Sequence, residues 1–204
     1  MDRGPEVDHP RAVAVGVASR PHPEESICGD IWTVDWRHGI CRVAIVDGLG
    51  HGPLAWAAAE AARESLAAHP ELNCIDSLRL CHLALKGTRG AAMSLALIDP
   101  ANDRLTFAGV GNVDGRLIVP GKTHRLTPDR GIVGSTFPTV RPIELHLPAR
   151  WHFALFSDGI GSRFALPLSG DEPALDLTSL AHQLLLEWAR KTDDATVLIA
   201  CLAP

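Results

Sequence analysis

The sequence predicts an α+β protein built as a four-layer αββα sandwich, in which two mainly antiparallel β-sheets pack face to face and helices cover them. Three observations support this fold class. Short apolar segments separated by tight turns dominate the chain, so hairpins are the main connection. Helical periodicity is confined to three stretches. No regular alternation of strand and helix occurs, which argues against a doubly wound parallel sheet.

The predicted elements follow one another as strands, two helices, more strands, one helix and one strand. Pro53 opens the first helix, where proline at the first helical position is favoured. Cys74 and Cys81 lie seven residues apart in the second helix and are expected on one buried face. The strands are expected at 11–18, 30–36, 43–46, 91–98, 104–110, 116–119, 142–147, 151–156 and 195–202, and the helices at 53–68, 72–85 and about 176–190.

Three of these strands are close together in the sequence. Short turns at 99–103 and 111–115 separate the strands at 91–98, 104–110 and 116–119. We therefore expect the three to form an antiparallel meander in one sheet.

Composition narrows the function classes. A chain of 204 residues without a visible linker predicts one domain over residues 1–204, with residues 1–10 as a loose end. The net charge of −5 argues against nucleic acid or an anionic membrane as a partner. Five cysteines without a Cys-x-x-Cys pair, and the absence of an apolar stretch of spanning length, indicate a cytoplasmic protein. We expect a monomer.

Acidic residues recur where predicted strands meet loops. Asp47 follows the buried strand at 43–46 and precedes Gly48, whose carbonyl no side chain shields. The others are Asp30, Asp158, Asp193 and Asp194. Strand ends at one edge of a sheet converge, and clustered carboxylates repel one another unless divalent cations neutralise them. Each acid taken alone is also typical of a simple turn, so the metal hypothesis rests on the repeated placement.

Four short motifs, in this order, resemble those of the metal-dependent PP2C-type serine/threonine phosphatases. They are Cys28-Gly-Asp30, Asp47-Gly-Leu-Gly-His-Gly52, Ser157-Asp-Gly-Ile160 and Asp193-Asp-Ala-Thr-Val197. The second motif is similar to the bacterial SpoIIE/RsbU/RsbX branch of that family. Two features of the chain resemble the compact RsbX-type members. The match leaves no room for a sensor domain, and the segment 88–94 leads into a strand.

The resemblance implies a fold of two antiparallel sheets flanked by helices and two bound Mn²⁺ or Mg²⁺ ions. Asp47 would bridge both ions, the Gly48 carbonyl would ligate one, and Asp30 would hold bound waters. Asp158 and Asp193 would complete the coordination of the second ion, with Asp194 as the alternative to Asp193. The implied reaction is the hydrolysis of phosphoserine or phosphothreonine by a metal-activated water. The implied substrates are phosphorylated STAS-domain proteins of a bacterial stress-signalling complex, the stressosome.

Several assignments stay open at this stage. The chain could instead be a phosphatase-like binding module that docks signalling proteins without turnover. His51 could protonate the leaving oxygen or be a turn residue packed on the helix start. Arg20 is the nearest candidate for phosphate binding. Lys86, Arg89 and the loop at 163–175 are candidate contacts for a protein substrate.

Overall fold

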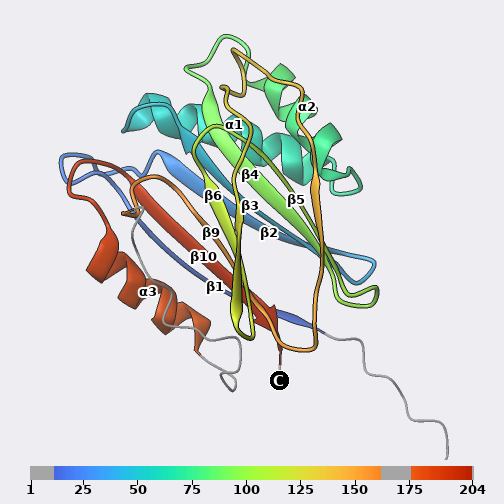
Figure 1. The fold of residues 1–204 in the computed structure, drawn as a ribbon. Coiled ribbons are helices and arrows are strands. Elements are labelled where there is room, and N and C mark those ends of the chain that lie inside the picture. The colour runs from blue at the N-terminus through green and yellow to red at the C-terminus, as the bar shows by residue number, and fades with distance from the viewer. Residues whose placement is uncertain (1–11, 162–175, 204) are drawn as a thin grey trace, which may run out of the picture.

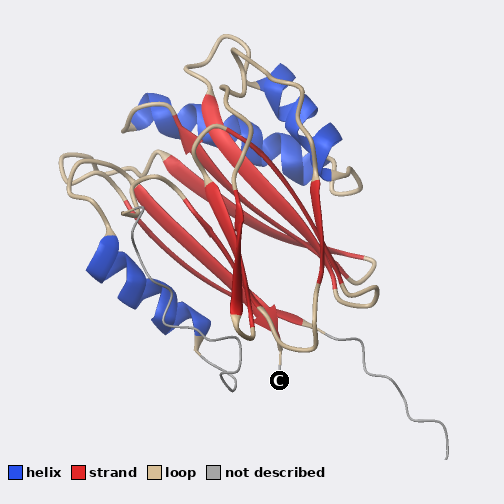
Figure 2. Ribbon diagram, viewed as in Figure 1, coloured by secondary structure: helices blue, strands red, loops and turns tan. Residues whose placement is uncertain are grey.

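The computed structural model describes residues 12–161 and 176–203, which fold into four layers (Figure 1). Two five-stranded sheets pack together, and each carries helices on its outer side. Helices α1 (Pro53–Ala68) and α2 (Cys74–Ala84) cover one sheet, and α3 (Leu177–Trp188) covers the other (Figure 2). The predicted αββα sandwich is confirmed.

All strand pairs are antiparallel. In spatial order, sheet A contains β1 (Val13–Arg20), β10 (Ala195–Leu202), β9 (His152–Phe156), β6 (Asp114–Val119) and β7 (Lys122–Leu126). In the same way, sheet B contains β2 (Asp30–Arg37), β3 (Ile40–Gly48), β4 (Ala91–Asp99), β5 (Arg104–Val110) and β8 (Ile143–His146). The C-terminal strand β10 therefore lies inside sheet A, between β1 and β9.

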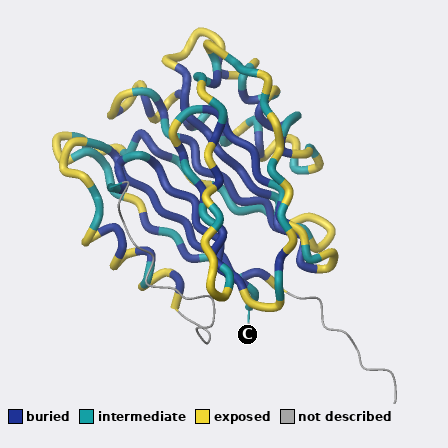
Figure 3. The backbone as a smooth tube through the Cα atoms, viewed as in Figure 1, coloured by how far each residue is buried: buried dark blue, intermediate teal, exposed yellow. Residues whose placement is uncertain are grey.

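Apolar side chains fill the three spaces between the four layers. Val43, Phe107 and Leu198 belong to the cluster between the two sheets. Cys74 and Cys81 share the cluster between sheet B and helices α1 and α2, as their spacing predicted, and all five cysteines are free thiols. Figure 3 shows that the strands are buried along most of their length, whereas many of the loops are exposed. None of the helices that the structure describes is long and apolar enough to cross a membrane.

The predicted meander is wrong in its third strand. Strands β4 and β5 pair in sheet B, but β6 pairs with β7 and β9 in sheet A. The chain changes sheets at Val113, which is buried between the sheets and whose carbonyl accepts a hydrogen bond of 2.6 Å from Ser94 Oγ. Phe107 and Leu117 point into the same inter-sheet core. Apolar alternation in a strand therefore looks the same whichever sheet the strand joins.

The strand β7 was absent from the prediction. Residues 120–121 form the hairpin turn between β6 and β7, and Gly121 has a φ of +72°. The strand itself has one buried residue, Leu126, and otherwise polar side chains at the edge of sheet A. Such a polar edge strand gives little hydrophobic signal.

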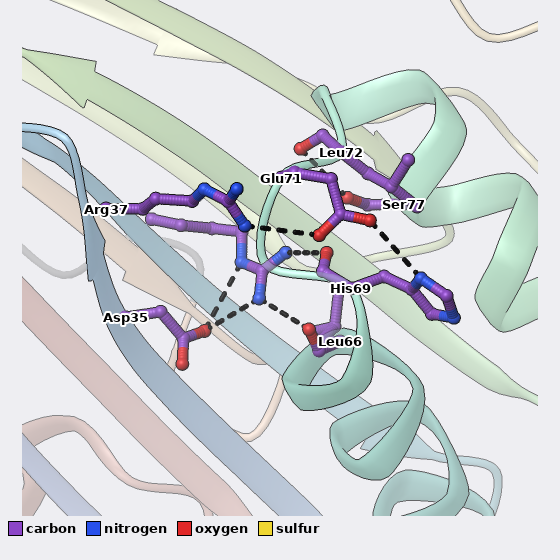
Figure 4. A network of polar contacts seen from close by, with 8 residues as sticks. Asp35, Arg37, Leu66, His69, Glu71, Leu72 and Ser77 are labelled. Atoms are coloured by element: carbon purple, nitrogen blue, oxygen red, sulfur yellow. Dashed lines mark hydrogen bonds and ion pairs between the residues drawn. The ribbon is translucent and has the colours of Figure 1, made fainter.

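A buried arginine anchors the end of α1 to sheet B (Figure 4). Arg42 lies on β3 and donates to the carbonyl oxygens of Leu66 at 2.7 Å and His69 at 3.1 Å. Its Nη2 atom also lies 3.0 Å from Asp35 Oδ2. A cleft of about 300 Å³ opens beside this network. It lies at the opposite end of β2 and β3 from Asp30 and Asp47, and its charged walls are largely paired with one another.

Candidate active site

Two carboxylates face each other across the β2–β3 hairpin. Asp30 begins β2 and pairs in register with Asp47, the penultimate residue of β3. Asp30 is buried, and its Oδ2 accepts a hydrogen bond of 2.6 Å from Ser157 Oγ. Burial raises the pKa of Asp30 to about 7, against the lowering effect of hydrogen bonds from Ser157 and Thr196.

Ser157 joins the two sheets at this point. It follows β9 in sheet A, and its backbone N–H donates to the carbonyl of Thr196 at 3.0 Å. Its hydroxyl oxygen accepts from the Thr196 N–H at 3.0 Å while its proton goes to Asp30 in sheet B. The sequence showed Ser157 only as the neighbour of Asp158. Its position directly after a buried strand was the signal that could have marked it.

Sheet A supplies the other three acids. Asp158 lies two residues beyond β9, and its Oδ2 accepts a hydrogen bond of 2.7 Å from Asn112 Nδ2. Asp194, immediately before β10, is buried, and its Oδ1 accepts from the His22 backbone N–H at 2.8 Å. The Oδ2 atom of Asp194 is also buried but has no hydrogen-bond partner. Asp193 Oδ1 accepts from the Asp194 backbone N–H at 3.0 Å, and burial followed by the charge of Asp158 raises its pKa.

The electrostatics of Asp47 show that the acids of both sheets act on one another. Burial raises the pKa of Asp47 well above its ordinary value of 3.8. Four other carboxylates raise it further: those of Asp30, Asp158, Asp193 and Asp194. The structure therefore brings together all five acids that the sequence singled out.

Gly48 lets helix α1 pack directly on the backbone beside Asp47. A Cβ atom at this position would lie 2.0 Å from the carbonyl oxygen of Ala55, so only glycine lets the first turn of α1 pack here. The Gly48 N–H donates to the Gly29 carbonyl at 3.2 Å. The loop after β3 is thus fixed both to α1 and to the segment that leads into β2.

His51 is held by the loop that precedes β2. Its Nδ1 donates to Glu25 Oε1 at 2.8 Å, and its ring stacks on that of His22 with centroids 4.4 Å apart. Because the His22 backbone also binds Asp194, this stack links the loop at 47–52 to the acid cluster of sheet A.

The donor set fits divalent cations that prefer oxygen. The candidate ligands are carboxylates and one backbone carbonyl, and Asp194 Oδ2 is a buried oxygen without a partner. The raised pKa values of Asp30, Asp47 and Asp193 show how unfavourable their shared negative charge is. In residues 12–161 and 176–203, no three His, Cys, Asp or Glu side chains already form a metal-binding group. Mg²⁺ suits such an open arrangement because it retains several waters and takes few protein ligands.

The sequence also singled out candidate contacts for phosphate and for a protein substrate. Arg20 ends β1, and its Nη2 donates to the carbonyl of Arg190, whereas its buried Nε has no hydrogen-bond partner within the described residues. Lys86 and Arg89 lie in the turn between α2 and β4. The loop at 163–175 and the expected loose end at 1–10 lie outside the described residues.

Comparison with known proteins agrees with this architecture. The chain is 34% identical over 91 residues to the phosphoserine phosphatase RsbX of Bacillus subtilis strain 168, a match covering 44% of this chain and 45% of that protein. It therefore spans less than half the length of that relative. The crystal structure of RsbX in complex with magnesium has the same fold, with a TM-score of 0.81 at 22% identity over 94% of this chain and 96% of that chain.

A second solved structure is also similar. It is described as "The bacterial stressosome: a modular system that has been adapted to control secondary messenger signaling", and gives a TM-score of 0.84 at 28% identity over 93% of this chain and 99% of that chain. The family model described as stage II sporulation protein E (SpoIIE) matches residues 37–203, which is most of the sequence. The chain belongs to the SpoIIE family.

Proposed function

We propose that this chain is a metal-dependent protein serine/threonine phosphatase. Its substrates would be phosphoserine or phosphothreonine on STAS-domain proteins of a bacterial stress-signalling complex in the cytoplasm. The observation that carries the proposal is the convergence of four other carboxylates, from both sheets, around that of Asp47. The phosphoserine phosphatase activity in the name of the Bacillus relative, and the stressosome in the description of the similar structure, support it.

Two Mn²⁺ or Mg²⁺ ions would be held by the acids and the Gly48 carbonyl. Asp47 would bridge them, and Asp158 and Asp193 would complete one site. Bound there, such ions supply Lewis acidity that lowers the pKa of a water and neutralises charge on phosphoryl oxygens. Asp193 would be the direct ligand and Asp194 the alternative, since each accepts one backbone N–H at its Oδ1 atom.

The chain's own residues orient the acids. Ser157 fixes one oxygen of Asp30, and Asn112 fixes one oxygen of Asp158. Hydrolysis joins a water oxygen to phosphorus and breaks the bond to the serine oxygen, which must then gain a proton. No covalent bond between the protein and the phosphoryl group is required.

The test compares the purified chain with two matched variants on para-nitrophenyl phosphate, with Mn²⁺ and with excess EDTA. Asp158→Asn should abolish Mn²⁺-dependent turnover. Asp103→Asn is the control, because Asp103 lies in the β4–β5 turn away from the acids and has a φ of +48°, which asparagine tolerates. Mn²⁺-dependent turnover that survives in Asp158→Asn would contradict the proposal, and no turnover in the wild type would favour the binding module.

The substrate assignment needs a second comparison. A phosphorylated STAS domain and a short phosphopeptide of the same sequence should differ in kcat/KM, with the folded domain preferred. An open site at the edge of two sheets admits a phosphorylated loop on a folded partner, whereas small metabolites usually bind in enclosed pockets. Equal values would remove the docking part of the proposal, and preference for phosphotyrosine would remove the substrate class.

A further inference from the structure

An arginine stands against the loop that carries Asp47. Arg89 lies in the turn between α2 and β4, and the backbone of this turn is well braced. Thr88 Oγ1 donates to the Leu85 carbonyl at 2.7 Å and accepts from the Gly90 N–H at 3.0 Å. The Leu49 N–H donates to the Gly90 carbonyl at 3.0 Å. Arg89 is thus anchored directly beside the loop at 47–52.

The guanidinium of Arg89 lies beside the backbone of Gly50. Gly50 has a φ of +85°, and a Cβ atom there would lie 2.8 Å from Arg89 Nη1. The side chain therefore packs over bare backbone three residues after Asp47. A left-handed residue without a side chain at this point serves both the turn and the approach of the cation.

Within the described part of the chain, Arg89 has no hydrogen-bond or ion-pair partner. This distinguishes it from Arg20, which binds the Arg190 carbonyl, and from Arg42, which binds Asp35 and two helix carbonyls. An exposed arginine without a partner is ordinary on a surface. Arg89, however, lies against the loop at 47–52 beside the carboxylates, where it could bind an anionic group that enters the site.

The proposed substrate brings such an anion. A phosphoryl group carries about two negative charges near neutral pH and enters a site whose own fixed charges are carboxylates. The charges that act most strongly on Asp47 are all carboxylates. The planar guanidinium of arginine presents paired N–H donors that match phosphate oxygens, and such charge-assisted bonds are among the strong ones.

We propose that Arg89 is a substrate-binding residue, whose guanidinium hydrogen-bonds the phosphoryl group at the acid cluster. The inference rests on the proposed phosphatase function and adds to it the residue that holds the phosphate. Arg89 comes from the turn before β4, and not from β1, where Arg20 lies.

The experiment uses inorganic phosphate as the probe and three variants of the full chain. With saturating Mn²⁺, the inhibition constant for phosphate against para-nitrophenyl phosphate should rise about tenfold in Arg89→Ala. Arg89→Lys should recover part of that loss, because lysine keeps the charge without the paired geometry. Lys122→Ala is the control and should leave the constant unchanged, because this exposed cation begins β7 at the end of β6 that lies away from the acids. The Mn²⁺ concentration for half-activation and the melting temperature should be the same in all three variants, which a merely structural role would not predict.

Three results would overturn the inference. The inhibition constant for phosphate could be unchanged in Arg89→Ala, or it could rise equally in Lys122→Ala. The third is a KM effect seen only with a phosphorylated STAS domain and not with phosphate, which would make Arg89 a docking residue. If the wild type shows no Mn²⁺-dependent turnover, the proposed function fails. Calorimetric binding of phosphate to the Mn²⁺-loaded wild type and Arg89→Ala then decides the role of Arg89 separately.

Discussion

Replacing Asp30 by asparagine should stabilise the metal-free protein at alkaline pH and not at acidic pH. Asp30 is buried, and its carboxyl pKa is raised from 3.8 to about 7 in the folded chain. A raised folded-state pKa contributes stability that is fully present below the unfolded value and is lost as the pH rises through the folded value. The wild type therefore loses stability from about pH 4 up to about pH 7. Asparagine does not titrate, so the variant lacks this loss.

The magnitude follows from the pKa shift. One pKa unit corresponds to about 1.4 kcal/mol, so the interval from pH 5 to the folded pKa of about 7 is worth about 3 kcal/mol. The asparagine oxygen can still accept from Ser157 Oγ, but its amide N–H₂ replaces a carboxylate oxygen at a cost of about 1–3 kcal/mol. Relative to the wild type, Asp30→Asn should gain about 3 kcal/mol of unfolding free energy between pH 5 and pH 8. That gain corresponds to about 6–12 °C in melting temperature for a chain of this size.

Urea unfolding in EDTA at pH 5, 6, 7 and 8, followed by tryptophan fluorescence, measures this difference. Asp103→Asn serves again as the control and should run parallel to the wild type across the range. If the gap between Asp30→Asn and the wild type is the same at every pH, the carboxyl of Asp30 is not the titrating group and the electrostatic reasoning is refuted.

Three further predictions concern the metal site and the fold. Asp47→Asn should lower Mn²⁺-dependent turnover at least about a hundredfold, because one carboxylate is expected to serve both ions; wild-type turnover in excess EDTA would contradict this. Mn²⁺ at a hundred times its Kd should add about 2.7 kcal/mol to the unfolding free energy. Asp47→Asn should reduce that increment, and a melting temperature insensitive to Mn²⁺ in the wild type would count against a folded site. Arg42→Met should lower the unfolding free energy by about 3 kcal/mol, because Asp35 and the carbonyls of Leu66 and His69 lose their partner. The KM should be unchanged, and an unaltered urea midpoint would argue against this anchor.

The parts of the fold that sequence reasoning could predict are those with a local signal. Helix α1 begins at Pro53 as expected, and the seven-residue spacing of Cys74 and Cys81 placed both on a buried face. The sheet to which β6 belongs has no local signal, because both sheets face one core. Strand β7 was missed because its burial is confined to Leu126.

The residues of the candidate site also fall into those with a local sequence signal and those without one. The five acids stood out because each lies where a strand meets a loop, and the structure brings them together. Their supports could not be found from the sequence, since these contacts join distant segments. Ser157 binds Asp30 across 127 positions, and the His22 backbone binds Asp194 across 172. The meeting of Arg89 with Gly50 depends on a left-handed turn that only the folded chain displays. The ligand roles themselves stay a prediction.

The position of β10 inside sheet A has a consequence for how the site is assembled. Asp193 and Asp194 enter the sheet with β10, and Ser157 is fixed by the Thr196 backbone on that same strand. Until β10 inserts between β1 and β9, sheet A is split, and Asp30 lacks the hydroxyl that orients it. Pairing of such distant segments carries a cost in loop-closure entropy that the contacts of the docked strand must offset. A partly folded chain therefore cannot display the complete acid cluster, and phosphatase activity would report that the last strand has docked.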